Sequence, residues 1–154
     1  SSDAFYAQFA SAINAFRVPV GVFSRLQIER SGDQAGTLDI KKGGVFPIVH
    51  GIRALALQKK LTVTPTLDRI EALVGMRVID QRFAREVAAA FSFLCTVRAE
   101  SGLASIESGG SATNRLRPDE LTQIDQRALA ESLRVVVKLR RLVGQNFRLD
   151  LLGF

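Results

Sequence analysis

The feature that most constrains the fold is a long two-faced pattern near the C-terminus. Between about Thr122 and Phe147, apolar residues recur at intervals of three and four, the spacing of one face of an α-helix. The apolar face carries Leu129, Leu133, Val136, Val143 and Phe147. Almost opposite lie Arg127, Arg134, Lys138, Arg141 and Arg148. The pattern predicts a helix that packs on one side only, with Thr122 placed to cap its first turn.

Upstream segments show the same helical spacing of apolar residues. They predict a first helix over about Asp3–Phe16, a second that starts near Pro47, a short third over about Thr66–Gly75 and a long fourth over about Asp80–Ala99 or farther. The core positions of the first and fourth helices are expected to be Phe5, Phe9, Ile13, Phe16, Phe83, Val87, Ala90, Phe91 and Leu94. Long helices with short connections favour a mainly α, up-and-down bundle of four to five main helices.

Between the first two helices the apolar spacing becomes alternating. Apolar and polar residues alternate over about Val22–Glu29 and again over Thr37–Lys41, on either side of the turn sequence SGDQAG. Alternation places successive side chains on opposite faces of a strand, and a Gly/Asp-rich turn joins neighbouring strands. We therefore expect one inserted β-hairpin, with Asp39 and Lys41 on its polar face.

Composition limits the class of protein. The chain has 154 residues, 47% hydrophobic and 23% charged, and we expect residues 1–154 to form one helical domain. No apolar run approaches the roughly 20 residues that cross a bilayer, so we expect no membrane partner. The chain begins with Ser1, and we expect it to be the C-terminal part of a longer multidomain protein.

Cysteine content and charge add two expectations. The lone Cys95 cannot form an internal disulfide, so we expect a cytoplasmic protein in which Cys95 is a small core residue. The formal net charge of +6 comes from 21 Lys and Arg against 15 Asp and Glu. A basic surface favours anionic partners such as nucleotides, nucleic acid or an acidic protein face, without choosing among them.

One short stretch combines positive charge with glycine just before a helix. Residues Leu38–Gly51 read LDIKKGGVFPIVHG. Glycines let backbone N–H groups approach a phosphate, a helix N-terminus attracts anions, and Lys41 or Lys42 adds a full charge. His50 and Arg53 follow on the helix, one turn apart, and can face the same pocket. The alternative is that the lysines are solvated, the glycines only permit the turn, and His50 is a core residue satisfied by one hydrogen bond.

Other chemistry is missing from the sequence. With one histidine and one cysteine, no HExxH or CxxC spacing exists for a metal. KKGG lacks the GxxxxGK[ST] spacing of a P-loop, and no GxSxG nucleophile elbow occurs. The sequence therefore offers a candidate binding site, with no catalytic residue and no metal ligand set.

Two segments carry a resemblance to a known family. LDIKKGGVFPIVHGIRALAL and, much later, NRLRPDELTQIDQRALAESLRVVVKLRRLV resemble the nucleotidyltransferase substrate-binding domain family. Domains of this family lie at the C-terminus of bacterial signalling proteins, after a cyclic-nucleotide-binding-like domain, a pair of CBS domains and a nucleotidyltransferase domain. The resemblance covers nearly the whole chain, from the first helix to Phe147.

The first segment is also similar to the region after the catalytic domain in the uridylyltransferases and adenylyltransferases of nitrogen regulation. The matching positions are Asp39, Lys41, Gly43 and Gly44. The chain departs from that pattern in having a second lysine, Lys42, and in having Phe46-Pro47 where those enzymes usually carry Arg-Asp.

The resemblance implies a substrate- or nucleotide-binding domain that completes the active site of a signalling nucleotidyltransferase. Catalysis would lie in a separate upstream domain that holds magnesium on paired aspartates, so this chain alone is not expected to be catalytic. The implied ligand is a nucleotide or phosphorylated small molecule, with Mg²⁺ and an ATP- or UTP-type nucleotide in the intact protein and no cofactor in this chain. The implied binding residues are Asp39, Lys41, Lys42, Gly43, Gly44, His50 and Arg53.

Two other classes of function stay open. A structural or regulatory module would dock on the catalytic or CBS domains without a ligand of its own and would expose an apolar patch, which could also form a homodimer. The charged side of the last helix, Arg127–Arg148, could bind nucleic acid. The chain has one tyrosine, no tryptophan and phenylalanines mainly at core positions, so surfaces for stacking bases are scarce and we do not expect this partner.

Overall fold

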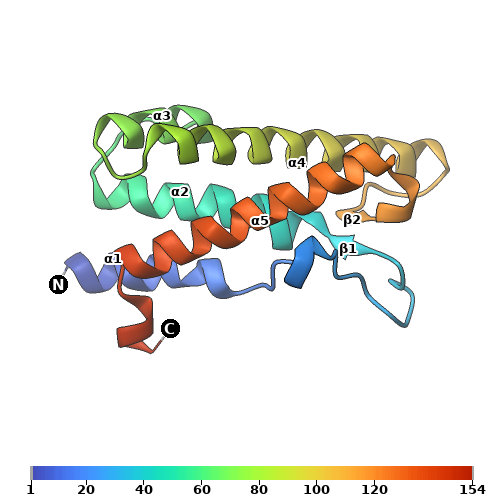
Figure 1. The fold of residues 1–154 in the computed structure, drawn as a ribbon, viewed down its shortest axis with the longest axis horizontal. Coiled ribbons are helices and arrows are strands. Elements are labelled where there is room, and N and C mark those ends of the chain that lie inside the picture. Colours follow the sequence, from blue (N-terminus) through green and yellow to red (C-terminus); the bar gives the residue numbers. More distant parts are fainter. Residues whose placement is uncertain (1, 154) are drawn as a thin grey trace.

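The computed structural model describes residues 2–153, which form a mainly α bundle, as predicted (Figure 1). α4 packs against α5, and α2 packs against α1, α3 and α5. α3 has the predicted bounds, and α4 continues beyond Ala99, as the sequence allowed. The helices are α1 (Ser2–Ser11), α2 (Phe46–Gln58), α3 (Thr66–Gly75), α4 (Gln81–Glu107) and α5 (Gln123–Asn146).

α5 has the two faces that its sequence predicts. All five apolar residues of the predicted face, including Leu129 and Leu133, are buried, and the basic residues opposite are exposed. The Thr122 hydroxyl oxygen accepts a hydrogen bond from the N–H of Asp125 at 3.1 Å, which satisfies one free donor of the first turn. The predicted cap and the predicted packing face are both confirmed.

The buried face of α1 differs from the predicted one, whereas that of α4 contains the predicted Val87, Ala90 and Leu94 but not Phe83 and Phe91. α1 turns Ala7 and Ala10 inward, whereas Phe5 is 61% exposed. α4 buries Ala84, Val87, Ala90, Leu94 and Val97 and leaves Phe83 and Phe91 half-buried. Alanine at the inward positions lets neighbouring helices approach closely, so the larger phenylalanines lie at the margins of the contact.

The predicted pairing of the two strands is wrong. β1 (Leu38–Asp39) pairs antiparallel with β2 (Arg115–Leu116), so the small two-stranded ladder joins segments far apart in the chain. The ladder sets the buried Leu38 opposite the buried Leu116. Residues 20–26 are not free to pair with β1 because they fold back on themselves, with a bridge between Val20 and Leu26.

The turn before β1 closes near the predicted place. The N–H of Glu29 donates to the carbonyl oxygen of Thr37, and the N–H of Gly36 donates to that of Glu29, each at 2.8 Å. The SGDQAG sequence therefore makes a turn, but β1 leaves it to join β2.

The KKGG stretch is helical, where the sequence suggested a flexible turn. Lys41–Val45 form a π-helical turn that runs directly into α2. Asp39 caps this helix, because its Oδ1 accepts a hydrogen bond from the N–H of Lys42 at 2.8 Å. The π-helical turn thus begins at the end of β1, and Pro47 lies in the first turn of α2 that follows it, as predicted.

α4 is the one helix within residues 2–153 that is long and apolar enough to cross a membrane. Length and composition alone are weak evidence for a span. The helix also carries Arg98 and Glu100, and its inner face packs in the bundle against α3 and α5.

Candidate functional site

A recess of about 280 Å³ lies where three distant segments meet. The segments are the chain that follows α1, the junction of β1 with the π-helical turn, and β2. The lining residues with chemistry of interest are Phe16, Arg17, Asp39, Lys42, Gly43 and Arg115. We call this feature the recess.

The β1–β2 ladder brings the first pair of charged residues together. Asp39 and Arg115 are directly opposed in the ladder, so their side chains leave it on the same face. Asn114, just before β2, is held by two contacts: its carbonyl oxygen accepts from the N–H of Ile40 at 3.0 Å, and its Oδ1 accepts from Arg98 Nε at 2.8 Å. These contacts fix the position of Arg115 relative to the start of the helix.

Gly43 brings the third segment to the recess. A Cβ at Gly43 would lie 2.5 Å from Pro19 Cδ and 3.1 Å from the carbonyl oxygen of Arg17. Only glycine therefore lets the Arg17–Pro19 segment pass this close to the helix. Gly44 serves a different contact, because a Cβ there would lie 3.3 Å from Leu94 Cδ1 in the core. The close approach that the two glycines permit is made by the protein itself.

Backbone donors at the start of the helix already have protein acceptors. The N–H of Ile40 donates to Asn114, and the N–H of Lys42 donates to the carboxylate of Asp39. An anion in the recess would therefore meet side-chain cations rather than these two N–H groups.

The recess holds more positive than negative charge. Three cations line it, from Arg17, Lys42 and Arg115, together with the carboxylates of Glu29 and Asp39. Arg115 Nη1 lies 4.0 Å from Glu29 Oε1, a long contact between partly exposed groups. Two guanidinium groups and one ammonium group in one small recess suit a phosphate, because arginine can donate two parallel hydrogen bonds to it.

His50 and Arg53 lie away from the recess, on the part of α2 that packs against α1. The His50 ring stacks on Phe9 with centroids 4.5 Å apart and on Phe46 with centroids 5.2 Å apart. Its Nε2–H donates to the carbonyl oxygen of Phe9 at 2.6 Å. Arg53 Cζ lies over the same Phe9 ring, 5.6 Å from its centroid.

These rings continue to the edge of the recess. Phe46 meets Phe16 edge to face with centroids 5.7 Å apart, and Lys42 Nζ lies 5.2 Å from the centroid of Phe16. We call the row of Phe9, His50, Phe46 and Phe16 the aromatic column. Its contacts are those of a packed structural element, in agreement with the interpretation of His50 as a residue satisfied by one hydrogen bond.

The seven predicted binding residues are thus divided between different surroundings. Asp39, Lys42 and Gly43 line the recess. Lys41 is exposed outside it, and Gly44 lies in the core. The sequence interpretation missed Arg17 and Arg115. Arg115 stands at the start of the second segment that resembles the family, which was the available signal. Its position opposite Asp39 depends on the β1–β2 pairing, which the sequence analysis did not predict.

Cys95 lies on α4, half-buried, beside a separate recess near the C-terminal end of that helix. Burial raises the pKa of the Cys95 thiol, and the nearby Arg98 partly opposes this. The thiol therefore stays protonated at neutral pH and is a poor nucleophile.

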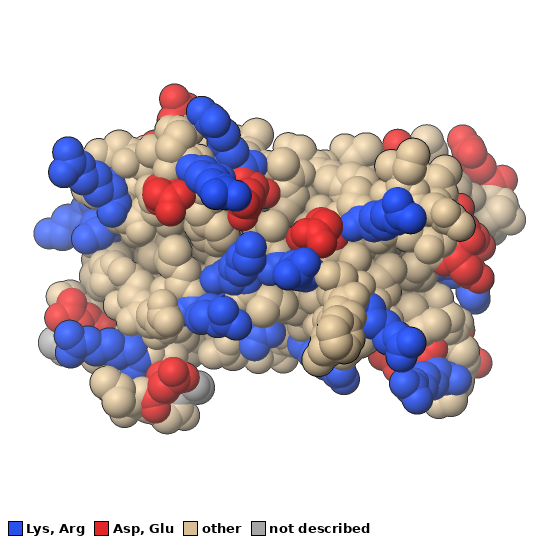
Figure 2. Space-filling view, viewed as in Figure 1, with Lys and Arg blue, Asp and Glu red and all other residues tan. Residues whose placement is uncertain are grey.

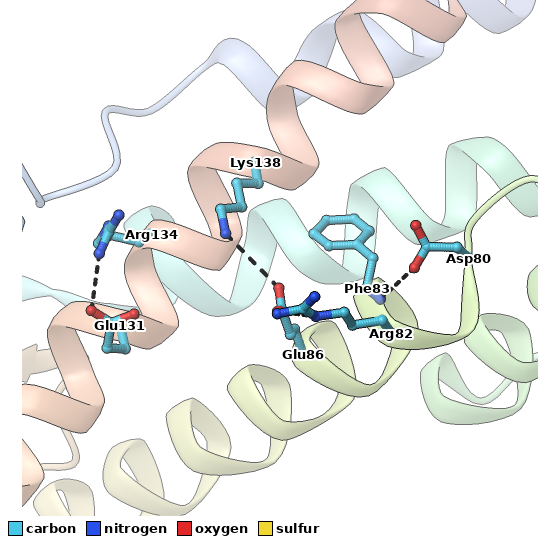
Figure 3. Close-up of polar contacts among 7 residues, drawn as sticks. All are labelled: Asp80, Arg82, Phe83, Glu86, Glu131, Arg134 and Lys138. Atoms are coloured by element: carbon cyan, nitrogen blue, oxygen red, sulfur yellow. Dashed lines mark hydrogen bonds and ion pairs between the residues drawn. The ribbon is translucent and has the colours of Figure 1, made fainter.

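The basic side of α5 is partly balanced by acidic residues, as the mixed colours across the middle of Figure 2 show. Arg134 pairs with Glu131 at 3.1 Å, and Lys138 Nζ lies 4.0 Å from Glu86 (Figure 3). Exposed ion pairs such as these contribute about 1 kcal/mol or less. This geometry agrees with a solvated face.

A protein-family model described as "Putative nucleotidyltransferase substrate binding domain" matches residues 3–147. The matched range includes all three segments that form the recess. No curated protein and no solved structure matches the chain.

Proposed function

Since the chain belongs to the nucleotidyltransferase substrate-binding domain family, we propose that its recess binds the phosphate groups of a nucleotide or phosphorylated substrate. The observation that carries this proposal is the convergence of Arg17, Lys42 and Arg115 from three separate segments. The three cations outnumber the two carboxylates of the recess, and an anionic ligand would offset the remaining repulsion between the cations.

The size of the recess indicates which part of a ligand it holds. Sites for whole small molecules usually measure about 300–1,000 Å³, and this recess, at about 280 Å³, lies just below that range. It fits a di- or triphosphate better than a complete nucleotide. The rest of the ligand would extend past Phe16, which is 37% exposed at the rim. A second protein surface would then have to cover the base, the sugar or the acceptor group.

We propose that this surface belongs to a catalytic nucleotidyltransferase domain of the same cytoplasmic protein, outside this chain. The present domain would hold and orient the substrate, which lowers the entropic cost of reaction, and the catalytic domain would carry out the transfer. Regulation by the CBS and cyclic-nucleotide-binding-like domains is part of the same proposal.

Magnesium belongs to the proposal only as an ion bound to the nucleotide. Among residues 2–153, no group of three or more His, Cys, Asp or Glu side chains is placed to hold a metal ion. The two carboxylates at the recess, from Glu29 and Asp39, do not form such a group, and Asp39 caps the helix. The residues present therefore do not fit a resident magnesium site in this chain.

The proposal is tested by calorimetric titration of the chain with ATP, UTP and inorganic triphosphate. Lys42→Ala and Arg115→Ala should each weaken binding by at least about tenfold, since a hydrogen bond to a charged group contributes roughly 1.5–3 kcal/mol. Lys41→Ala is the matched control, because it removes the neighbouring exposed lysine outside the recess and should leave the affinity unchanged. Equal affinity in all three variants would place the site elsewhere.

A second function, docking on another domain, is favoured by the loop tip at Val22–Ser24. Phe23 is 99% exposed and Val22 is 77% exposed. Phe23 and Ser24 both have φ of 58°, a left-handed conformation that costs about 1–2 kcal/mol for a non-glycine residue. A strained, fully exposed aromatic residue is explained if a partner covers it.

We propose an acidic, partly apolar protein surface as this partner. A second pocket, beside Phe23 and distinct from the recess, is lined by Arg17, Arg25 and Arg30, which would attract acidic side chains. The test is binding of the chain to the rest of the protein supplied separately. Phe23→Ser should weaken that association and leave triphosphate binding unchanged. Unchanged association would remove this function.

A further inference from the structure

The outer side of α4 forms one continuous face that no other helix or strand of residues 2–153 covers, although its C-terminal part borders the loop at residues 112–114. In Figure 1, α4 runs along the upper edge of the bundle. The residues of this face recur with alternating steps of four and three, the spacing of a coiled-coil seam, and all are exposed. They are Arg85, Ala89, Ser92, Thr96, Ala99, Leu103 and Ile106.

This face is more apolar than solvent contact alone would favour. Leu103 and Ile106 are 58% and 52% exposed. Only 22% of the most apolar window of α4 is buried, and the inward face of the helix ends at Val97. The last part of α4 therefore extends beyond the core of the bundle and presents large apolar side chains to water.

Charge on α4 is arranged so that the helix complements itself in one orientation. Near its N-terminal end Arg82 and Arg85 outnumber Glu86, and near its C-terminal end Glu100 and Glu107 outnumber Arg98. Residues 87–97 carry no charge. A second α4 in antiparallel orientation would set the net positive end of each helix beside the net negative end of the other, whereas a parallel one would set ends of like net charge together.

We propose that α4 pairs in antiparallel orientation with α4 of a second copy of the chain, across a two-fold axis near Ser92–Thr96. The same patch then serves both copies, as a two-fold interface requires. In this arrangement Ala89 faces Ala99 of the second copy, and these small side chains let the helices approach closely. Leu103 and Ile106 of each copy pack against the Arg82–Arg85 end of the other, with the stems of the arginines covering them.

The small contact area of this arrangement predicts a dimer of low affinity. The contact covers one helix per copy over about 36 Å, from Arg82 to Ile106, and such an interface is smaller than that of a permanent dimer. We therefore expect a dissociation constant in the micromolar range, on the order of 10–100 μM. The interface goes beyond the proposed function, because it uses no residue of the recess.

Sedimentation velocity of the complete chain at concentrations from about 5 to 500 μM tests the proposal. The wild-type chain should shift from monomer to dimer over this range. Arg85→Glu and Glu100→Arg should each weaken the dimer at least tenfold. The chain that carries both substitutions should recover most of the loss, because the charges on the two copies are again complementary. Arg141→Glu, a charge reversal on the exposed side of α5, is the matched control and should leave the dimer unchanged.

Circular dichroism would confirm that each variant keeps its helix content.

Three results would overturn the proposal. One is a monomer at every concentration, which would leave the face to a different domain or partner. The others are a dimer that ignores both charge reversals, and single variants that weaken it without recovery in the double variant.

Discussion

The recess and the aromatic column use residues of one short segment in opposite ways. Lys42 and His50 are eight residues apart, about 12 Å along a helix. Lys42 lines an open recess beside a strand ladder, whereas His50 is stacked between two rings and hydrogen-bonded to Phe9. Residue type and sequence spacing suggest one site, but the segments that pack on the helix divide it. A cation that lines an open recess is accessible to a ligand. The ring of His50, in contrast, already contacts Phe9 and Phe46 and donates its hydrogen bond to the protein.

The largest expected effect tests how closely the recess is packed. Gly43→Ala would force a Cβ against Pro19 and the backbone of Arg17, so it should lower the free energy of unfolding by about 1–3 kcal/mol and weaken triphosphate binding. Gly144→Ala is the control, since nothing lies within 4 Å of a Cβ there, and it should raise stability by up to about 1 kcal/mol. Urea denaturation measures both, and a neutral Gly43→Ala would show that the close approach is not required.

The next effect concerns the aromatic column. His50→Ala removes one hydrogen bond and two ring contacts, so it should destabilise the chain by about 1–2 kcal/mol. Triphosphate affinity, measured by calorimetry, should change less than about twofold, which is under about 0.4 kcal/mol, because His50 lies outside the recess. A large loss of affinity with little loss of stability would instead return His50 to the ligand site.

A smaller effect separates the two roles open to Asp39. Asp39→Asn keeps a side-chain oxygen that can cap the helix, so stability should change little, whereas Asp39→Ala should cost about 1 kcal/mol. Asp39→Asn also removes a negative charge from the recess, and we expect triphosphate affinity to rise severalfold. If Asp39 bound a ligand hydroxyl or a ligand-held cation, the affinity would fall instead.

The smallest effect lies outside both regions, at Cys95. Because burial raises the pKa of this thiol, its neutral form is favoured in the folded chain. Stability from this residue should be fully present below the unfolded pKa of about 8.5 and should decrease as pH rises above it. The stability of the wild type relative to Cys95→Ala should therefore fall as the pH is raised above about 8.5, measured by urea denaturation at each pH. A constant difference would contradict the raised pKa.

Much of the bundle follows from helical periodicity. The bounds of α3, the cap at Thr122 and the buried face of α5 were predictable, because each depends on neighbouring residues along one helix. The inward face of α1, and the place of Ala84 on that of α4, were not, because alanine carries a weak apolar signal, although its small size suits close helix contacts.

The recess was only partly predictable. Lys42 and Gly43 lie in a stretch that the sequence marks by charge and glycine, but Arg17 and Arg115 reach it through contacts between distant segments. Those contacts depend on the β1–β2 ladder, which has two residues in each strand. A strand this short has almost no alternating pattern to recognise.

The central claim is that the recess, and not the aromatic column, receives phosphate. Two-dimensional ¹H–¹⁵N NMR of the chain during titration with ATP, with and without magnesium, tests it most directly. The account predicts that the amide signals of Arg17, Lys42, Gly43 and Arg115 shift together and saturate together, while those of Phe9 and Arg53 stay in place. Shifts centred on His50 and Arg53, with the recess signals unmoved, would contradict it.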